Sequence, residues 1–243
     1  MNKTLLISGV LLALTASVAS AGGVNLTWND CYGGGGVSNR AFACNSNDGN
    51  NDLYVTFEPD ENIPDVYGSN PIIDLRSAST DLPAWWRFRH AGTCRQASLS
   101  ALTSPTGTCT DTWAGQGVAS VAAYFTQANA PQVVPAPNRA RILSSVSVPE
   151  AFAANVDPGT EYFCLLIRIN NAKTVGTDSC AGCQVPVCLV VSEILLVSIN
   201  SGDHRLFAPI GNNLAYWQSS PFYTCIDTPT LNRTWGQVKS LYR

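Results

Sequence analysis

Two long apolar runs joined by a cysteine-bearing loop constrain the fold of this chain more than any other feature. In the first run, residues 161–170, every odd-numbered position from Phe163 to Ile169 is apolar, whereas the even-numbered positions include the charged Arg168. A period of two places successive side chains on opposite faces of a strand. The second run, residues 185–200, is rich in Val and Ile, which suit a pleated sheet. Together the runs predict two or three strands near the middle of a sheet.

The loop between these runs holds Cys180, Cys183 and Cys188. Cysteines at this spacing could supply thiolates to zinc or to an iron–sulfur cluster, and a metal site at this loop is a weaker alternative. Gln184 stands where a c-type haem motif needs histidine, which excludes that motif. Because an exported chain favours disulfides, we expect two bridges among these three cysteines and Cys225. Four cysteines allow three connectivities, and the sequence does not choose among them.

The first 21 residues have the pattern of a secretory signal peptide. Lys3 supplies the positive start, residues 5–14 are apolar, and Ala19, Ser20 and Ala21 form a small-residue cleavage site. We therefore expect an exported protein, secreted or periplasmic, that is cleaved near Ala21.

The remainder of the chain, residues 22–243, is expected to form one domain, because no stretch has the composition of a linker and all-β sandwiches reach this length. The chain has 14 Lys and Arg against 17 Asp and Glu, and only 13% of its residues are charged. This balance argues against nucleic acid or an anionic membrane as a partner. No hydrophobic stretch after the signal peptide is long enough to span a bilayer, and no cofactor is expected.

Four consecutive glycines, residues 33–36, lie between Cys31 and Cys44. A glycine-rich loop can approach a phosphate closely, but the Lys and Ser or Thr of a P-loop are absent. We therefore expect a flexible loop closed by a Cys31–Cys44 bridge.

The nine cysteines cannot all pair within one molecule. Cys164 lies inside an apolar strand, where a thiol behaves as a small buried hydrophobe, so we expect it to stay unpaired. A Cys94–Cys109 bridge is expected to close a loop rich in Ser and Thr.

The polar run 45–52 carries the oxygen ligands that calcium prefers, with Asp48 and Asp52 as its candidate carboxylates. The run fails the EF-hand pattern, since Val55 stands where the last glutamate belongs. We expect an Asn/Asp-rich turn ahead of a strand, with a calcium site of another type as the alternative.

The most aromatic stretch, residues 83–90, contains Trp85 and Trp86. Exposed, these rings would form a stacking platform for sugar or peptide; buried, they would belong to the core. We expect at least one of them to be buried. The candidate binding residues are Trp85, Trp86 and Trp113.

Few residues are available for catalysis. His90 and His204 are the two histidines, and the chain has no GxSxG, HExxH or Walker motif. A Ser–His–acid triad stays open, because its members meet in space rather than in sequence. A glycosidase needs two carboxylates. Glu193 is the acid that burial would most readily keep protonated. The favoured interpretation is nevertheless that Glu193 points outward from an edge or kink of its strand. The other available acids are Glu58, Asp60, Glu61, Glu150 and Glu161.

The remaining pattern predicts further strands and one helix. The best helix candidate is residues 117–127, where Val118, Val121 and Phe125 fall on one helical face. The strand candidates are residues 24–28, 53–57, 72–75, 141–148, 204–207 and 214–217. We predict a single all-β domain: a β-sandwich of jelly-roll or immunoglobulin-like kind, with long disulfide-tied loops and at most one or two short helices. Long loops favour the jelly roll.

Three segments carry a resemblance: VNLTWNDC at 24–31, INNAKTVGTDSCAGCQVPVCLVVSEI at 169–194 and NRTWGQVKSLYR at 232–243. The chain resembles uncharacterised exported hypothetical proteins of environmental bacteria. The resemblance implies a bacterial exported protein that ends at Arg243. It implies no activity and supplies no functional residues.

These observations favour non-catalytic binding or a structural role outside the cytoplasm. Low charge, abundant small polar residues and several aromatic residues suit a sandwich that binds carbohydrate, so a polysaccharide or a cell-surface component is the expected partner class. The alternative is a secreted, glycosidase-like hydrolase that uses paired carboxylates.

Overall fold

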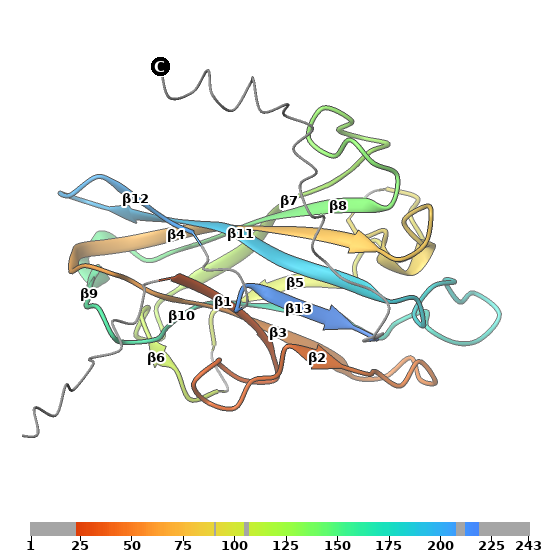
Figure 1. Cartoon of the computed structure of the whole chain (residues 1–243), viewed down its shortest axis with the longest axis horizontal. Coiled ribbons are helices and arrows are strands. Elements are labelled where there is room, and N and C mark those ends of the chain that lie inside the picture. The colour runs from red at the N-terminus through yellow and green to blue at the C-terminus, as the bar shows by residue number, and fades with distance from the viewer. Residues whose placement is uncertain (1–22, 90, 105–106, 208–211, 219–243) are drawn as a thin grey trace, which may run out of the picture.

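A computed structural model describes residues 23–89, 91–104, 107–207 and 212–218. Within these residues two β-sheets pack against each other, and loops project from both ends (Figure 1). The predicted all-β sandwich is confirmed; the helical residues described are two three-residue 3-10 turns, η1 (Ala84–Trp86) and η2 (Glu150–Phe152). No described helix is long and apolar enough to cross a membrane. The predicted signal peptide and Cys225 lie outside the described residues.

The strands form two sheets that are largely antiparallel. The first sheet has the order β1 (Gly23–Trp28), β3 (Asn50–Glu58), β10 (Tyr162–Asn170) and β5 (Leu99–Leu102), and β6 (Thr110–Asp111) pairs with β10. The second sheet has the order β2 (Asn39–Arg40), β13 (Leu214–Trp217), β11 (Val187–Ser198), β4 (Ile63–Ser77), β8 (Arg139–Ser147) and β7 (Val118–Thr126). Two further strands extend it: β12 (Asp203–Leu206) pairs with β11, and β9 (Ala154–Val156) pairs with β4.

The two apolar runs lie in the interior of their sheets, as predicted. β10 pairs with β3 on one side and with β5 on the other, and β11 pairs with β13 and β4. Phe163, Leu165 and Ile167 are fully buried, because β10 faces the core between the sheets. The second run forms one long strand, and its pairing with β4 is interrupted by a bulge at Glu193.

Residues 117–127 form an edge strand, β7, and not the predicted helix. β7 pairs antiparallel with β8 along its whole length, and the register shifts between Val121 and Ala123. Such a bulge adds one residue to the alternation of a strand. Val121 and Tyr124 are therefore both buried although they lie three positions apart, whereas Val118 is 73% exposed. A spacing of three produced by a bulge looks like a helical face in the sequence.

The tryptophans proposed as ligand-binding residues belong to the core. Trp85 and Trp86 have 0% exposure, and their ring centroids lie 4.8 and 5.3 Å from that of Trp217. Trp113 is equally buried, and its Nε1 donates a hydrogen bond of 2.6 Å to the carbonyl of Cys164. The prediction that these three side chains bind a ligand is wrong, because their rings have no face open to solvent.

Disulfides connect loops that are far apart in sequence. Cysteines 31 and 44, and cysteines 94 and 109, do not pair with each other, so both expected short-range bridges are wrong. The two cysteines of each expected pair lie on different loops, and each bonds to a cysteine 78 to 139 residues away in the sequence. The three bridges are Cys31–Cys109, Cys44–Cys183 and Cys94–Cys180, and Cys188 is also disulfide-bonded. The expectation of two bridges among Cys180, Cys183, Cys188 and Cys225 is therefore wrong as well, because Cys180 and Cys183 bond to cysteines outside this group. Three disulfides among the described residues indicate an oxidising compartment.

Cys164 is the free cysteine of the described residues and is buried, as predicted. Its Sγ lies 2.8 Å from the hydroxyl oxygen of Ser69. Burial raises the pKa of Cys164 to about 12, so the group stays a neutral thiol inside the core.

Candidate functional site

The tetraglycine loop is packed against its neighbours rather than open to a phosphate. The Glu161 carboxylate accepts hydrogen bonds from the backbone N–H of Tyr32 (2.9 Å) and of Gly33 (2.8 Å). A Cβ atom at Gly36 would lie 2.2 Å from the carbonyl oxygen of Asp30. Close packing therefore requires glycine in this loop, and an internal carboxylate already uses the amides that a phosphate would need. The flexible loop expected from the composition is not what the structure shows.

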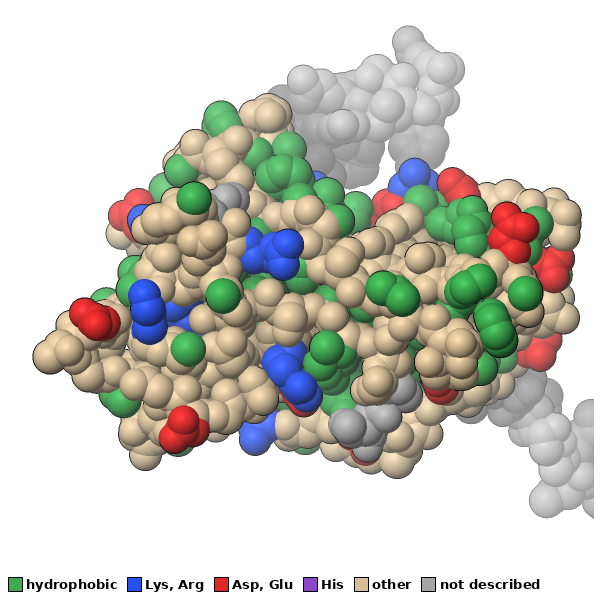
Figure 2. Space-filling view, turned by 180° about the vertical axis from the view of Figure 1, so that it is seen from behind, with side chains coloured by type: hydrophobic (Ala, Val, Ile, Leu, Met, Phe, Trp, Pro, Cys, Tyr) green, Lys and Arg blue, Asp and Glu red, His purple; other side chains and the backbone are tan. Residues whose placement is uncertain are grey.

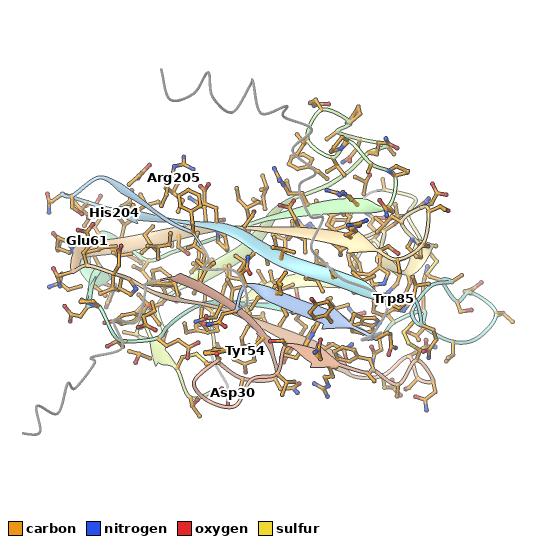
Figure 3. The ribbon with its side chains drawn as sticks, in the orientation of Figure 1. Asp30, Tyr54, Glu61, Trp85, His204 and Arg205 are labelled. Atoms are coloured by element: carbon orange, nitrogen blue, oxygen red, sulfur yellow. A yellow bond between two sulfur atoms is a disulfide. The ribbon has the colours of Figure 1, made fainter. Side chains whose placement is uncertain are left out.

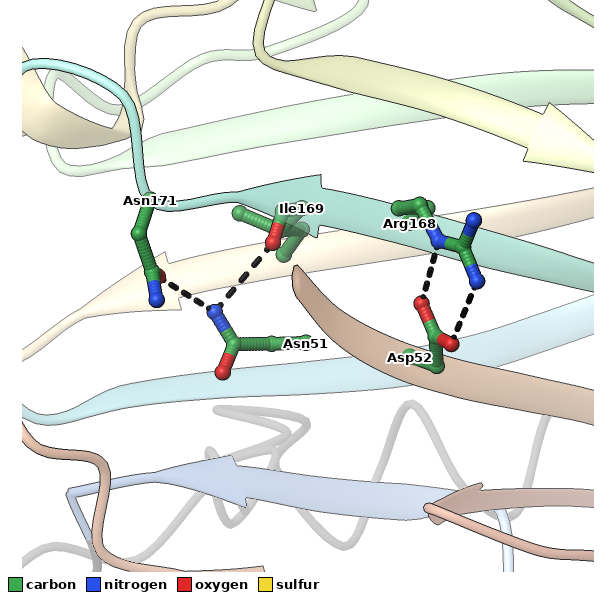
Figure 4. Close-up of polar contacts among 5 residues, drawn as sticks. All are labelled: Asn51, Asp52, Arg168, Ile169 and Asn171. Atoms are coloured by element: carbon green, nitrogen blue, oxygen red, sulfur yellow. Dashed lines mark hydrogen bonds and ion pairs between the residues drawn. The ribbon is translucent and has the colours of Figure 1, made fainter. Parts of the chain in front are cut away.

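The two calcium candidates do not form a site. Arg168 donates from Nε and Nη2 to the two carboxylate oxygens of Asp52, each at 2.7 Å (Figure 4), and this hydrogen bonding raises the pKa of Arg168. The carbonyl oxygen of Asp48 accepts a hydrogen bond of 2.9 Å from Asn171 Nδ2. No group of three or more His, Cys, Asp or Glu among the described residues could hold a metal ion.

The cysteine loop also offers no metal site. Cys180 and Cys183 are bonded to Cys94 and Cys44, and Cys188 is disulfide-bonded as well. A metal would need thiolates, and oxidised cysteines have none. The alternative of a metal at this loop is therefore wrong, and the loop links two parts of the sandwich covalently.

Three of the candidate acids are engaged singly rather than in a facing pair. Glu193 lies at the β11 bulge with its side chain 17% exposed, and forms an ion pair with Arg205. Glu161 binds the tetraglycine loop, and Glu61 lies 3.5 Å from Nδ1 of His204. A glycosidase needs two carboxylates that flank one scissile bond, and these contacts supply no such pair.

A cavity of about 670 Å³ opens at the end of the sandwich that carries η1. Its walls come from two segments, the loop around η1, which also carries the candidates Trp85 and Trp86, and the connection from β7 to β8, in which the sequence pattern indicated no site. Its volume falls in the range of small-molecule pockets. The lining residues are Asp81, Leu82, Arg87, Thr93, Thr126, Gln127, Ala128, Asn129 and Pro137.

A backbone hydrogen bond joins the two walls of this cavity. The N–H of Leu82 donates to the carbonyl of Pro137 (2.9 Å), and Arg87 Nε donates to the carbonyl of Leu82 (2.9 Å). On the opposite wall the Asn129 side-chain oxygen accepts from the N–H of Thr126 (2.6 Å). The Leu82–Pro137 bond therefore links the two walls directly, and the other two bonds order each wall internally.

A buried arginine contacts the η1 loop from the core side. The guanidinium of Arg95 lies 3.5 Å above the ring of Trp85, and its Nη1 donates to the Trp85 carbonyl at 3.2 Å. Arg95 is 1% exposed, and burial lowers its pKa to about 9. The neighbouring Cys94–Cys180 bridge ties the same loop to the cysteine loop. Trp85 and Trp86 thus lie in the core beneath the η1 loop and do not line the cavity.

Comparison with known proteins gives little guidance on function. No protein-family model matches the sequence, and no curated protein matches it. Among solved structures, the chain is similar to a cohesin module from the Clostridium perfringens ATCC13124 family 33 glycoside hydrolase. The identity is 9%, the TM-score is 0.30, and the match covers 80% of this chain and 93% of the module. A likeness this low supports no conclusion about activity or partners.

Proposed function

We propose that this chain is an exported binding module of a bacterium, secreted or periplasmic, whose main cavity binds a polysaccharide or another cell-surface component without catalysis. The observation that carries the proposal is the cavity between the η1 loop and the β7–β8 connection. The disulfides support export, since such bonds persist in oxidising compartments. Export would use a signal peptide cleaved near Ala21.

The lining of the cavity suits a ligand rich in hydroxyl groups. Asp81 brings a carboxylate, Arg87 a guanidinium and Gln127 an amide, and Ala128 and Pro137 contribute apolar atoms to the lining. Sugars carry hydroxyls that both donate and accept hydrogen bonds, along with apolar C–H faces. Charges of both signs within the cavity favour such a ligand over a highly charged polymer. Figure 2 likewise shows a face on which charged side chains are sparse and of both signs.

Rigidity of the walls supports binding without a large conformational change. The cavity lies between a 3-10 turn packed on the core and a connection between two paired strands, and a disulfide holds the η1 loop. A preformed site loses less conformational entropy when it binds a ligand. A loop-end site on a sandwich therefore needs no moving lid.

Retention on insoluble polysaccharides tests this proposal. The purified protein would be incubated with cellulose, chitin, xylan and peptidoglycan, and bound protein would be measured after sedimentation. An Asp81→Ala, Arg87→Ala double variant is expected to bind the retained polymer about 10- to 100-fold more weakly, the cost of charge-assisted hydrogen bonds. Arg89→Ala is the matched control, since Arg89 lies on the same loop and does not line the cavity.

Two results would contradict the proposal. One is a double variant that is retained as well as the wild type. The other is a wild type that none of the four polymers retains. A melting temperature measured for each variant separates loss of the site from loss of the fold.

A further inference from the structure

A serine, a histidine and a glutamate lie in a row at the opposite end of the sandwich. Ser201 lies in the turn between β11 and β12, His204 lies in β12, and Glu61 lies in the connection from β3 to β4. His204 Nε2 lies 3.0 Å from Ser201 Oγ, and His204 Nδ1 lies 3.5 Å from Glu61 Oε1. Figure 3 shows Glu61 and His204 at the end of the molecule remote from Trp85.

We infer that this row is a Ser–His–Glu relay, which makes Ser201 a nucleophile toward small acyl esters. The two ring nitrogens of His204 face the two partners that such a relay requires, a hydroxyl on one side and a carboxylate on the other. With Nδ1–H directed at Glu61, Nε2 is left to accept the Ser201 proton. This site is distinct from the cavity and does not depend on the function proposed for it.

The turn that carries Ser201 is fastened to the segment that carries Glu61. The N–H of Ile199 donates to the carbonyl of Asp65 (3.1 Å), and Asn200 Nδ2 donates to its carboxylate (2.8 Å). The Ser198 hydroxyl donates to the Pro64 carbonyl at 2.7 Å. These bonds link the β11–β12 turn to the start of β4, a few residues beyond Glu61.

Two further contacts set the position of the Ser201 side chain. Its N–H donates to Ser198 Oγ at 3.2 Å, and its own Oγ lies 2.8 Å from the same oxygen. The Ser201 hydroxyl donates to Ser198 Oγ in this arrangement, because the Ser198 proton is directed at the Pro64 carbonyl; rotation about the Ser201 Cβ–Oγ bond turns the Ser201 proton to His204 Nε2, 3.0 Å away. His204 is paired with Leu196 in the antiparallel pairing of β11 and β12, so the backbone that carries the imidazole is held in a regular strand.

The chemistry of the relay is acyl transfer. Ser201 Oγ attacks the carbonyl carbon of the ester, a C–O bond forms, and the hydroxyl proton passes to His204 Nε2. The tetrahedral intermediate collapses, the C–O bond to the alcohol breaks, and the alcohol leaves with that proton. Water, deprotonated by the same nitrogen, then attacks the acyl-serine and releases the carboxylic acid and free Ser201.

The exposure of the row indicates the kind of substrate. The side chain of His204 is 23% exposed and that of Glu61 is 67% exposed, so the relay lies at the surface. An open surface gives no pocket for a long acyl chain and leaves room for a bulky alcohol. The substrate class is therefore a short acyl ester, such as acetyl, on an alcohol of any size.

Covalent labelling of Ser201 is the primary test. The full chain would be treated with an alkyl fluorophosphonate, which phosphonylates an activated serine with loss of fluoride, and the adduct would be located by mass spectrometry. The inference predicts one adduct, on Ser201, and none in Ser201→Ala. Ser179→Ala, which removes another exposed serine, should label like the wild type. An unlabelled Ser201 would overturn the inference, as would a Ser201→Ala variant that is labelled to the same extent elsewhere.

Hydrolysis of p-nitrophenyl acetate separates the roles of the other two residues. His204→Gln is expected to lower kcat about 100-fold or more, as loss of a general base does. Glu61 acts through His204 as a positioning residue, so Glu61→Gln should lower kcat with little change in KM, and Glu61→Asp should restore part of the rate. If all variants hydrolyse the ester at the wild-type rate, the relay has no catalytic role. The cavity variants should keep full labelling, which distinguishes this test from that of the binding site.

Discussion

Replacing Trp85 with alanine should destabilise the fold strongly, because this side chain contacts several other members of the aromatic core. Its ring packs 4.8 Å from Trp217 and 5.0 Å from Trp86, and the Arg95 guanidinium lies 3.5 Å above it. Its Nε1 also donates to Thr174 Oγ1 at 3.0 Å. Truncating a buried tryptophan costs about 3–5 kcal/mol, and loss of the cation–π contact places this variant near the upper limit.

A loss of this size takes up a large part of the 5–15 kcal/mol that stabilises a typical domain. Guanidinium denaturation followed by circular dichroism would measure the free energy of unfolding of the wild type and of Trp85→Ala. The matched control is Phe207→Ala, since Phe207 is 58% exposed and should change stability by less than about 0.5 kcal/mol. A Trp85→Ala variant that loses less than about 1 kcal/mol would refute the burial of this ring and restore it as a binding platform.

Three further predictions address the thiol, the glycine loop and the calcium candidates. Because burial raises the Cys164 pKa to about 12 in the fold from an ordinary value of 9.0, the unfolded thiol ionises first as pH rises above 9. The free energy of unfolding should therefore fall by about 1.4 kcal/mol between pH 8 and pH 10. Urea unfolding at several pH values should show this fall in the wild type and a smaller one in Cys164→Ala. An equal dependence on pH in both proteins would contradict the buried thiol. Gly36→Ala should cost about 1–3 kcal/mol in urea unfolding, because its Cβ would lie 2.2 Å from the Asp30 carbonyl oxygen, and an unchanged stability would show an open loop. Calcium chloride should leave the melting temperature unchanged, since Arg168 occupies both oxygens of Asp52, and a rise would reveal a calcium site.

The strands could be predicted because their signal is local. Alternation from Phe163 to Ile169 and the Val-rich run after it identify strands without knowledge of their partners, and both became interior strands. Bulges limit the prediction of strands from alternating apolar residues. At β7 a single extra residue between Val121 and Ala123 turned a strand pattern into an apparent helical one.

The disulfides and the sites depend on contacts that sequence spacing does not reveal. Cys31 pairs with Cys109 rather than with the nearer Cys44, because the sandwich brings distant loops together. The sequence left a Ser–His–acid row open but could not name its members. Glu61 lies 140 positions before Ser201, and the pairing of β11 with β4, together with the hydrogen bonds from the β11–β12 turn, brings these segments together.

Likewise, the aromatic stretch lies beside the candidate cavity, although its tryptophans do not form the binding surface that the sequence predicted. Trp85 and Trp86 are core residues, and the cavity above them is lined by their exposed neighbour Arg87 and by residues of the β7–β8 connection. Composition alone does not separate a ring that supports a site from a ring that forms it.

A chemical-shift titration tests the binding cavity most directly. Backbone amides of the ¹⁵N-labelled protein would be followed by NMR as cellohexaose, chitohexaose or xylohexaose is added. Binding at the cavity predicts that the shifted amides cluster in residues 81–93 and 126–134, while those of β12 at the other end stay in place. Shifts that cluster elsewhere, or no shifts with any of the three oligosaccharides, would contradict carbohydrate binding at this cavity.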